Sequence, residues 1–209
     1  MLQSLWETAT MVGLAVGAAI VLGLPLGTLL YLTRRGGLLE HATLYTTINS
    51  LVNLIRSFPF LILLVALIPI TRFVLGTSLG TVAASVPLGV AAIAYYSRLS
   101  EQSLLDVDAG VIEAAQAMGA TVWELLFKFL FVEALPGLVL GLTISIISFI
   151  SYSTLAGAVG GGGIGDFAIQ YGYYRFETDV MVATMIIIAV IVQAVQFGGS
   201  RLSRHFDKR

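Results

Sequence analysis

Long apolar stretches separated by short polar segments dominate the pattern of this chain. Five of them have the length of membrane spans, and they cover residues 8–32, 48–70, 79–97, 136–155 and 180–197. An α-helix of about 20 apolar residues crosses a hydrocarbon core about 30 Å thick. The pattern therefore predicts an all-α integral membrane protein whose five transmembrane helices lie in a single domain, residues 1–209.

The composition supports this prediction and excludes several classes of protein. Hydrophobic residues make up 57% of the chain, its mean hydropathy is +0.94, and charged residues make up 11%, against about 25% in soluble domains. The absence of cysteine excludes disulfides, thiol nucleophiles and cysteine metal sites. No basic patch with interleaved aromatic residues is present, so we expect no nucleic-acid partner. The first apolar stretch is too long for a signal-peptide core and is expected to remain as a span.

The charged segment between the third and fourth apolar stretches, residues 98–135, carries strong helix signals. Asp108 is placed to cap a helix that ends at Gly119. Thr121 then begins a second helix, in which Glu124 completes a capping box. The first helix is expected to expose three small residues to a close-packing partner, namely Ala114, Ala115 and Ala117. By pattern alone, a docking element and an interfacial amphipathic segment without a partner both fit.

The spacing within this segment resembles the EAA loop of permease subunits in ABC importers. Glu113–Ala115 is followed, after three further residues, by Gly119, as in that signature. The signature continues through nine residues to Ile-x-Leu-Pro, and the corresponding places here hold Phe129, Phe131 and Val132. The family proline is therefore missing, and Pro136 is expected to supply a break instead.

The resemblance implies a type I importer permease fold and a set of partners. Two copies of the permease would assemble with two ATPase subunits and an external substrate-binding protein or lipoprotein, and the EAA helix would rest in a groove on the ATPase. The docking residues carried over are Glu113, Ala114, Ala115 and Gly119. No G-x-x-x-x-G-K-[ST] occurs in the sequence. ATP and Mg²⁺ are therefore expected on the partner, and no cofactor is expected in this chain.

The fourth apolar stretch contains hydroxyl residues in helical register. Ser145, Ser148 and Ser151 fall roughly on one face, which either lines a solute pathway or makes interhelical hydrogen bonds. Four consecutive glycines follow, and irregular backbone at membrane depth must be buried in protein or line a cavity. We expect the pathway and its gate at Ser148, Ser151, Thr154, Leu155, Gly160, Gly161, Gly162 and Gly163.

Residues 151–176, SYSTLAGAVGGGGIGDFAIQYGYYRF, closely resemble the methionine-uptake branch of these permeases. The resemblance implies import of methionine, as the L or D form or both, with another small amino acid or polar solute as the alternative. A formal G-x-G-x-x-G begins at Gly160, but no strand precedes it, so we expect no dinucleotide site. The aromatic residues of this stretch are typical of a membrane interface.

Two further features have alternative interpretations. The pairs Gly13/Gly17 and Gly23/Gly27 allow close helix approach, and packing within the subunit is favoured over dimerisation. Arg56 lies within the second apolar stretch. Its favoured interpretation is snorkelling to the headgroups, and an ion pair near the docking segment is the functional alternative.

Positive charges divide unequally between the two sides of the predicted membrane. We call the charged segment, residues 98–135, the docking segment. The side that holds it has eight positive residues, which are Arg34, Arg35, Arg98, Lys128, Arg201, Arg204, Lys208 and Arg209. The other side has Arg72 and Arg175. The positive-inside rule therefore predicts a cytoplasmic docking segment and C-terminus, with the N-terminus outside. The expected location is the cytoplasmic (inner) membrane, surrounded by lipid.

A secondary transporter or channel and a membrane-embedded enzyme are the competing interpretations. Ion-coupled carriers usually keep an acidic residue or a histidine at membrane depth, and the last three apolar stretches hold none well inside. A passive pore remains compatible with the pattern. An enzyme would need a nucleophile with its base, or metal ligands, whereas the two histidines are isolated and no H-E-x-x-H occurs. We therefore predict a transport subunit rather than an enzyme.

Overall fold

The structure is a computed structural model that describes residues 1–207, and the regular elements in that part of the chain are all helices. The first helix is continuous through α1 (Leu2–Ala18), a π-helical segment (Ala19–Gly23) and α2 (Leu24–Thr33). It begins before the predicted residue 8. A wide π-helical turn lies directly before Leu24 and Pro25.

The second predicted span is broken rather than one straight helix. The chain forms α3 (Ala42–Ser57), α4 (Phe60–Ala66) and α5 (Ile68–Leu75), and α3 and α4 meet at 106°. Phe58 is extended (φ −82°, ψ 133°) because it precedes Pro59, which also lacks the N–H that would continue the helix.

The next two spans are longer than predicted. The third is α6 (Thr81–Leu105). After α7 (Ala109–Ala117), a second long helix comprises α8 (Val122–Glu124), a π-helical segment (Leu125–Leu130) and α9 (Phe131–Ala156).

The predicted break at Pro136 is wrong, because this residue lies inside α9. The wide turn occurs instead in the π-helical segment upstream. Neighbouring elements hold α9 on both sides of the proline: Ser203 Oγ donates a hydrogen bond to the Pro136 carbonyl oxygen (2.8 Å), and Gly137 packs against Ser103 of α6.

A π-helical segment (Gly157–Gly161) leads from α9 into α10 (Gly163–Phe167) and a further π-helical segment (Ala168–Tyr173). The last helix is α11 (Thr178–Phe206). Within residues 1–207, four helices are long and apolar enough to cross a membrane, and the bent α3–α4 pair would make a fifth span.

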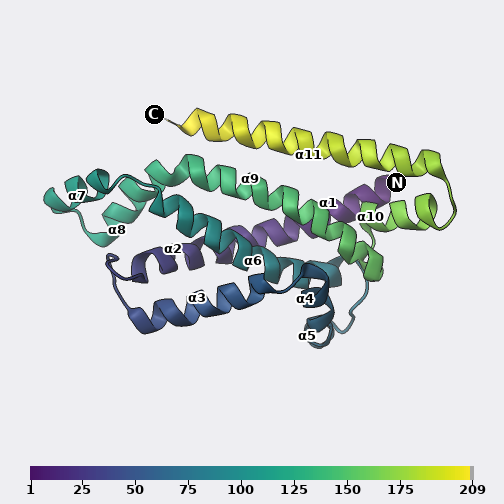
Figure 1. The fold of residues 1–209 in the computed structure, drawn as a ribbon, viewed down its shortest axis with the longest axis horizontal. Coiled ribbons are helices and arrows are strands. Elements are labelled where there is room, and N and C mark those ends of the chain that lie inside the picture. The colour runs from purple at the N-terminus through teal and green to yellow at the C-terminus, as the bar shows by residue number, and fades with distance from the viewer. Residues whose placement is uncertain (208–209) are drawn as a thin grey trace.

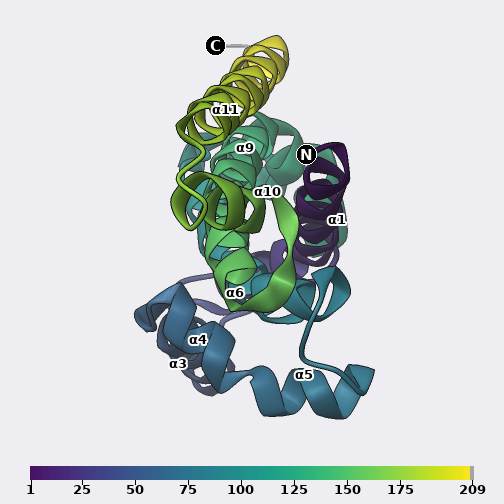
Figure 2. The ribbon, with the colours of Figure 1, turned by 90° about the vertical axis from the view of Figure 1, so that its right-hand side faces the viewer.

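The helices α1, α6 and α9 form the centre of the bundle (Figures 1 and 2), around a core that includes Met11, Leu88 and Phe149. Figure 2 shows α11 on one side of this centre and α3, α4 and α5 on the other. In Figure 1 the N-terminus lies at one end of the long axis, whereas the C-terminus lies at the other end together with α7 and α8. The docking segment and the C-terminus are therefore on the same side, as the sequence predicts.

The two glycine pairs behave differently. A Cβ atom at Gly23 or Gly27 would lie 3.0 Å from the Ile93 carbonyl oxygen or 2.3 Å from that of Ser97, so this pair packs closely on α6. A Cβ at Gly13 or Gly17 would meet no atom within 4 Å. The favoured interpretation, packing within the subunit, is thus right for the second pair and wrong for the first.

Candidate functional site

The predicted docking segment forms an elbow, residues 108–130, whose turn is closed by backbone hydrogen bonds. Asp108 caps α7 by accepting a hydrogen bond from the Gly110 N–H (2.7 Å). At the other end Gly119 has φ +79°, its N–H donates to the Gln116 carbonyl, and the Ala120 N–H donates to the Ala115 carbonyl. These two bonds define a Schellman motif, which satisfies the terminal carbonyls and requires the left-handed conformation that glycine adopts readily.

The second half of the elbow begins with the predicted capping box. Thr121 Oγ1 accepts a hydrogen bond from the Glu124 N–H, and the Glu124 carboxylate accepts one from the Thr121 N–H. Lys128 lies 2.9 Å from the same carboxylate, one turn further on. The start of this helix is therefore specified by local side chains, as the sequence indicates.

The inner face of the elbow is apolar and buried. Ala115 is 0% exposed, so the prediction that it belongs to an exposed alanine face is wrong. It packs instead in a cluster, named here the elbow cluster, whose other buried members are Tyr31, Leu32, Leu104, Val107, Leu125, Leu126, Leu130, Ala134 and Leu138. These residues come from α2, α6 and α9 as well as from the elbow. A force applied to α7 would therefore reach three long helices through close-packed side chains.

The outer face of α7 is open to a partner. Glu113, Ala114, Ala117 and Gly119 are exposed, and the Met118 side chain is 70% exposed. Small residues at Ala114 and Ala117 permit close approach of another surface. The flexible thioether of Met118 can adapt to such a surface. Three of the four predicted docking residues, all except Ala115, thus lie where another protein can reach them.

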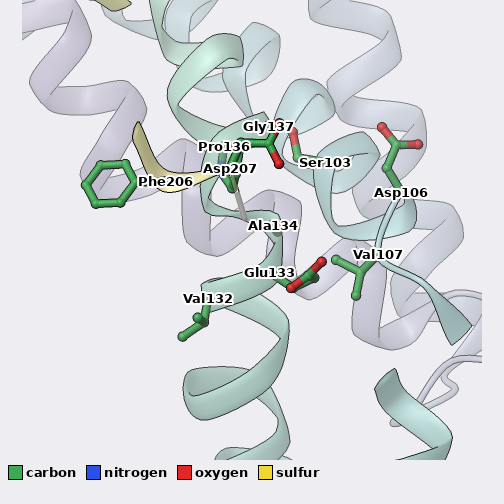
Figure 3. A pocket seen from close by; sticks show the side chains of 10 residues that line it. All are labelled: Ser103, Asp106, Val107, Val132, Glu133, Ala134, Pro136, Gly137, Phe206 and Asp207. Atoms are coloured by element: carbon green, nitrogen blue, oxygen red, sulfur yellow. The ribbon is translucent and has the colours of Figure 1, made fainter. Parts of the chain in front are cut away.

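The end of α11 lies beside the elbow. Figure 3 shows Phe206 and Asp207 near the ends of α6 and α9, around a cavity of about 180 Å³ whose lining includes Ser103, Asp106 and Glu133. The C-terminal helix therefore has direct contact with α9, the helix that continues from the elbow. Lys208 and Arg209, which contribute to the predicted positive side, lie outside the described residues.

The predicted pathway face is an exposed stripe on α9. Ile144, Ser148, Ser151 and Leu155 recur at intervals of three or four residues and lie on its outer side, with Ser148 half-buried. The hydroxyls of Ser148 and Ser151 donate to the carbonyls one turn before them, at 3.0 and 3.4 Å. Ser145, in contrast, is buried and also bonds within its helix. The three serines thus make no interhelical hydrogen bond within residues 1–207, and two of them leave a hydroxyl face open.

Thr154 does not share this stripe. A Cβ atom at Gly165 would lie 2.5 Å from Thr154, so this threonine packs against α10 inside the subunit. Thr154 is only partly buried, so its assignment to the pathway stays a prediction. The sequence could not show the contact with α10, because it depends on how α10 folds back on α9.

The glycine segment folds back at the outer end of α9. Gly160, Gly162 and Gly163 have φ of +92°, +74° and +90°, while Gly161 and Gly163 are buried. The Gly160 carbonyl accepts a hydrogen bond from the Gly80 N–H at 2.9 Å. Glycine is required here because L side chains rarely adopt these conformations. The predicted role of this segment as a gate stays a prediction.

Two residues near the N-terminus hold the far end of this segment, and sequence reasoning missed them. Glu7 accepts a hydrogen bond from the Gly163 N–H, and Thr8 Oγ1 accepts one from the Ile164 N–H, both at 2.8 Å. A lone acidic residue directly before an apolar stretch was the available signal. The bonds tie the start of α1 to the candidate gate.

A polar network between α3 and α6 was also missed. Arg98 donates to Asn49 Oδ1 (2.6 Å) and Asn53 Oδ1 (2.8 Å), and it pairs with Glu101 on its own helix. Arg56 lies one turn beyond Asn53, and within residues 1–207 it makes no ion pair. The alternative in which Arg56 pairs near the docking segment is therefore wrong for the described residues.

Comparison with known proteins identifies a family of membrane transport proteins, in agreement with the helical fold described above. Residues 19–209 match the family described as binding-protein-dependent transport system inner membrane component. The chain is 44% identical to the probable D-methionine transport system permease protein MetI of Vibrio cholerae serotype O1, over 100% of this chain and 93% of that protein. It is 46% identical to the D-methionine transport system permease protein MetI of Escherichia coli K12, over 75% of this chain and 72% of that one.

Solved structures agree in fold. A chain from an inward-facing structure of the MetNI methionine ABC transporter superposes with a TM-score of 0.96 at 43% identity, covering 100% of this chain and 96% of that one. A chain from an amino acid ABC transporter solved with histidines shares the fold alone, with a TM-score of 0.75 at 21% identity. The predicted permease family is confirmed: the chain belongs to the family of binding-protein-dependent transport system inner membrane components.

Proposed function

We propose that this chain is the permease subunit of an ATP-driven importer that carries methionine, in the L or D form or both, across the inner membrane. The observation that carries the proposal is the near full-length similarity to MetI permeases and to the MetNI transporter chain. Two copies of the chain would assemble with two ATPase subunits, and a substrate-binding protein or lipoprotein would deliver the solute.

The elbow supports the docking role of Glu113, Ala114 and Gly119. Its outer face is exposed while its inner face packs in the elbow cluster. An ATPase subunit seated on α7 could therefore move α2, α6 and α9 as one body. Such rigid-body rotation about an interface is a common form of switching, and ATP would drive it by binding one state better than the other. The nucleotide and Mg²⁺ belong to the ATPase subunit in this proposal, and no cofactor is assigned to this chain.

The exposed stripe on α9 supports a pathway shared by two copies. Ser148, Ser151 and Leu155 face away from the subunit, with Gly160–Gly163 at its outer end as the candidate gate. A second copy facing this stripe would enclose a path with hydroxyls for a zwitterion and apolar walls for a thioether side chain. Thr154 would support the gate from within, through its contact with Gly165.

Charge supports the orientation of the chain. The elbow and the C-terminus share one end of the molecule with Arg34 and Arg35, whereas Arg72 and Arg175 lie in segments at the end that holds the N-terminus. We place the elbow in the cytoplasm and the N-terminus outside by the positive-inside rule. We also treat the chain as one transmembrane domain, since α6 contributes to all three buried clusters.

The proposal is tested by uptake in proteoliposomes that contain this chain with its cognate ATPase and binding protein. ATP inside the vesicles should drive uptake of labelled methionine, and unlabelled L- or D-methionine should compete. Competition only by another small amino acid or polar solute would contradict the methionine assignment. Uptake driven by an ion gradient without ATP would favour a secondary transporter instead.

A further inference from the structure

Arg56 faces a cavity at mid-depth of the bundle. The cavity has a volume of about 120 Å³, and its lining includes Arg56, Phe60, Ala91, Tyr95 and Tyr152. Ala91 and Tyr95 are each ten residues from the nearer end of α6 (Thr81–Leu105), which is about 15 Å along a helix. This depth favours a site inside the protein over the predicted snorkelling to headgroups.

The charge of Arg56 has no counterpart on its own chain. No hydrogen bond or ion pair of its guanidinium is found in the part of the chain that the structure describes, and the side chain is exposed in the single subunit. The neighbouring Arg98, in contrast, binds Asn49, Asn53 and Glu101 through its two terminal nitrogens. A charged residue at membrane depth without a protein partner marks a solute or ion pathway more often than a structural position.

Aromatic rings line the same cavity as the guanidinium. Phe60 and Tyr152 stack with their centroids 4.8 Å apart and their planes at 8°, and Phe149 lies beside both Tyr95 and Tyr152. Aromatic rings make favourable contacts with thioether sulfur and with other apolar side chains. Ser148 of the stripe lies four residues before Tyr152 on α9, and residues four apart are neighbours on a helix surface, so the cavity borders the exposed stripe.

The break between α3 and α4 adds a third kind of group. Arg56 lies in the last turn of α3, where helix carbonyls lack the N–H partners of a continuing helix. These carbonyls carry partial negative charge and favour a cation. A guanidinium, a helix C-terminus and an aromatic wall at one cavity are complementary to the carboxylate, the ammonium group and the side chain of a zwitterionic amino acid. Broken helices near mid-membrane commonly build such sites in transporters.

We propose that Arg56 and the rings of Phe60, Tyr95 and Tyr152 form a transient binding site for an apolar amino acid within the translocation pathway. Arg56 holds the α-carboxylate, and the rings hold the side chain. The inference rests on the proposed function as an amino-acid importer, and it assigns a substrate contact to each copy of the chain.

The test uses the complete assembly in proteoliposomes, with methionine and its carboxamide as the labelled solutes. Arg56→Gln should reduce methionine uptake by about tenfold or more, because a hydrogen bond to a charged group is lost. Uptake of the carboxamide relative to methionine should rise, and Arg56→Lys should restore part of the loss. Binding-protein-stimulated ATP hydrolysis should persist in both variants. Arg72→Gln, at the outer end of α5, is the matched control and should leave uptake unchanged.

A second measurement uses the wild-type assembly and does not depend on the folding of a variant. Phenylglyoxal should modify Arg56, as detected by mass spectrometry of its peptide, and methionine should protect it while the carboxamide should not. Equal methionine uptake by Arg56→Gln and the wild type, or no protection by methionine, would overturn this inference alone. Failure of the wild-type assembly to import methionine would overturn the proposed function together with it.

Discussion

The elbow and the stripe on α9, the two surfaces to which we assign function, have opposite construction. In the elbow, the Schellman motif and the capping box satisfy the helix ends, and the apolar side is closed by the elbow cluster. Along the stripe, by contrast, Ser148, Ser151 and Leu155 face outward from a helix that is packed only on its other sides. The apolar side of the elbow is covered within one subunit, whereas the stripe and the side chain of Arg56 are exposed on it.

This difference fits the two proposed roles, in which the elbow transmits movement and the stripe lines the solute pathway. A segment that transmits movement must be stiff, and close packing with satisfied hydrogen bonds provides stiffness. A pathway must open and close, so its walls are divided between bodies that can move apart. Each substitution considered next changes one of the two surfaces and leaves the other intact.

The largest effect is expected from Gly119→Val. The φ of +79° costs roughly 1–2 kcal/mol for a residue with a Cβ, and more for a β-branched one. The turn should therefore shift and displace α7 from its partner. We expect ATP-driven uptake to fall by about tenfold or more while the protein still inserts. Gly36→Val is the matched control, because Gly36 has φ +72° and equal free space but lies in the α2–α3 loop. Normal uptake by Gly119→Val would argue against the docking role.

Two adjacent alanines should respond in different ways. Ala115→Leu forces three carbon atoms into the elbow cluster and should lower the free energy of unfolding by about 1–3 kcal/mol, seen as a lower thermal midpoint of the purified permease. The Ala114 side chain is exposed, so Ala114→Leu should change the free energy of unfolding by less than about 0.5 kcal/mol. It should instead weaken co-purification with the ATPase. Similar behaviour of the two variants would remove the distinction between the inner and outer faces of α7.

A smaller effect is expected at the gate from Glu7→Gln. The amide oxygen can still accept a hydrogen bond from the Gly163 N–H, but a charge-assisted bond is roughly twice as strong as a neutral one. The loss should be about 1 kcal/mol in thermal stability of the assembly. Gln3→Ala, which removes a surface contact to the other Glu7 oxygen, is the control. An unchanged midpoint for Glu7→Gln would show that this bond does not hold the glycine segment.

The elbow could be predicted in detail because its signals are local. Asp108, Gly119, Thr121 and Glu124 act on backbone groups within a few residues, so their spacing specifies the turn. The burial of Ala115 could not be predicted, since it depends on where α2 and α6 end. Long apolar stretches likewise indicated the membrane class, and residues 1–207 hold four helices of membrane-spanning length, or five spans if the bent α3–α4 pair is one.

The pathway side was less predictable because its contacts join distant parts of the chain. Glu7 meets Gly163, and Arg98 meets Asn49 and Asn53, over separations that no local pattern reports. The sharp α3–α4 bend at Pro59 was hidden by an apolar pattern that continues through it. Hydropathy indicates that residues belong to the membrane, but it does not indicate whether the helix through them is straight.

The central claim is that the outer face of α7 contacts the ATPase subunit, and site-specific cross-linking there tests it most directly. Because the chain has no cysteine, an introduced cysteine is its only thiol. We predict that Ala114→Cys, treated with a thiol–amine cross-linker in the ATP-hydrolysing assembly, forms a covalent product with the ATPase subunit. Phe73→Cys, at a side chain 91% exposed in α5 at the opposite end, should form none. An active assembly in which Ala114→Cys gives no ATPase product, or in which only Phe73→Cys does, would contradict the account.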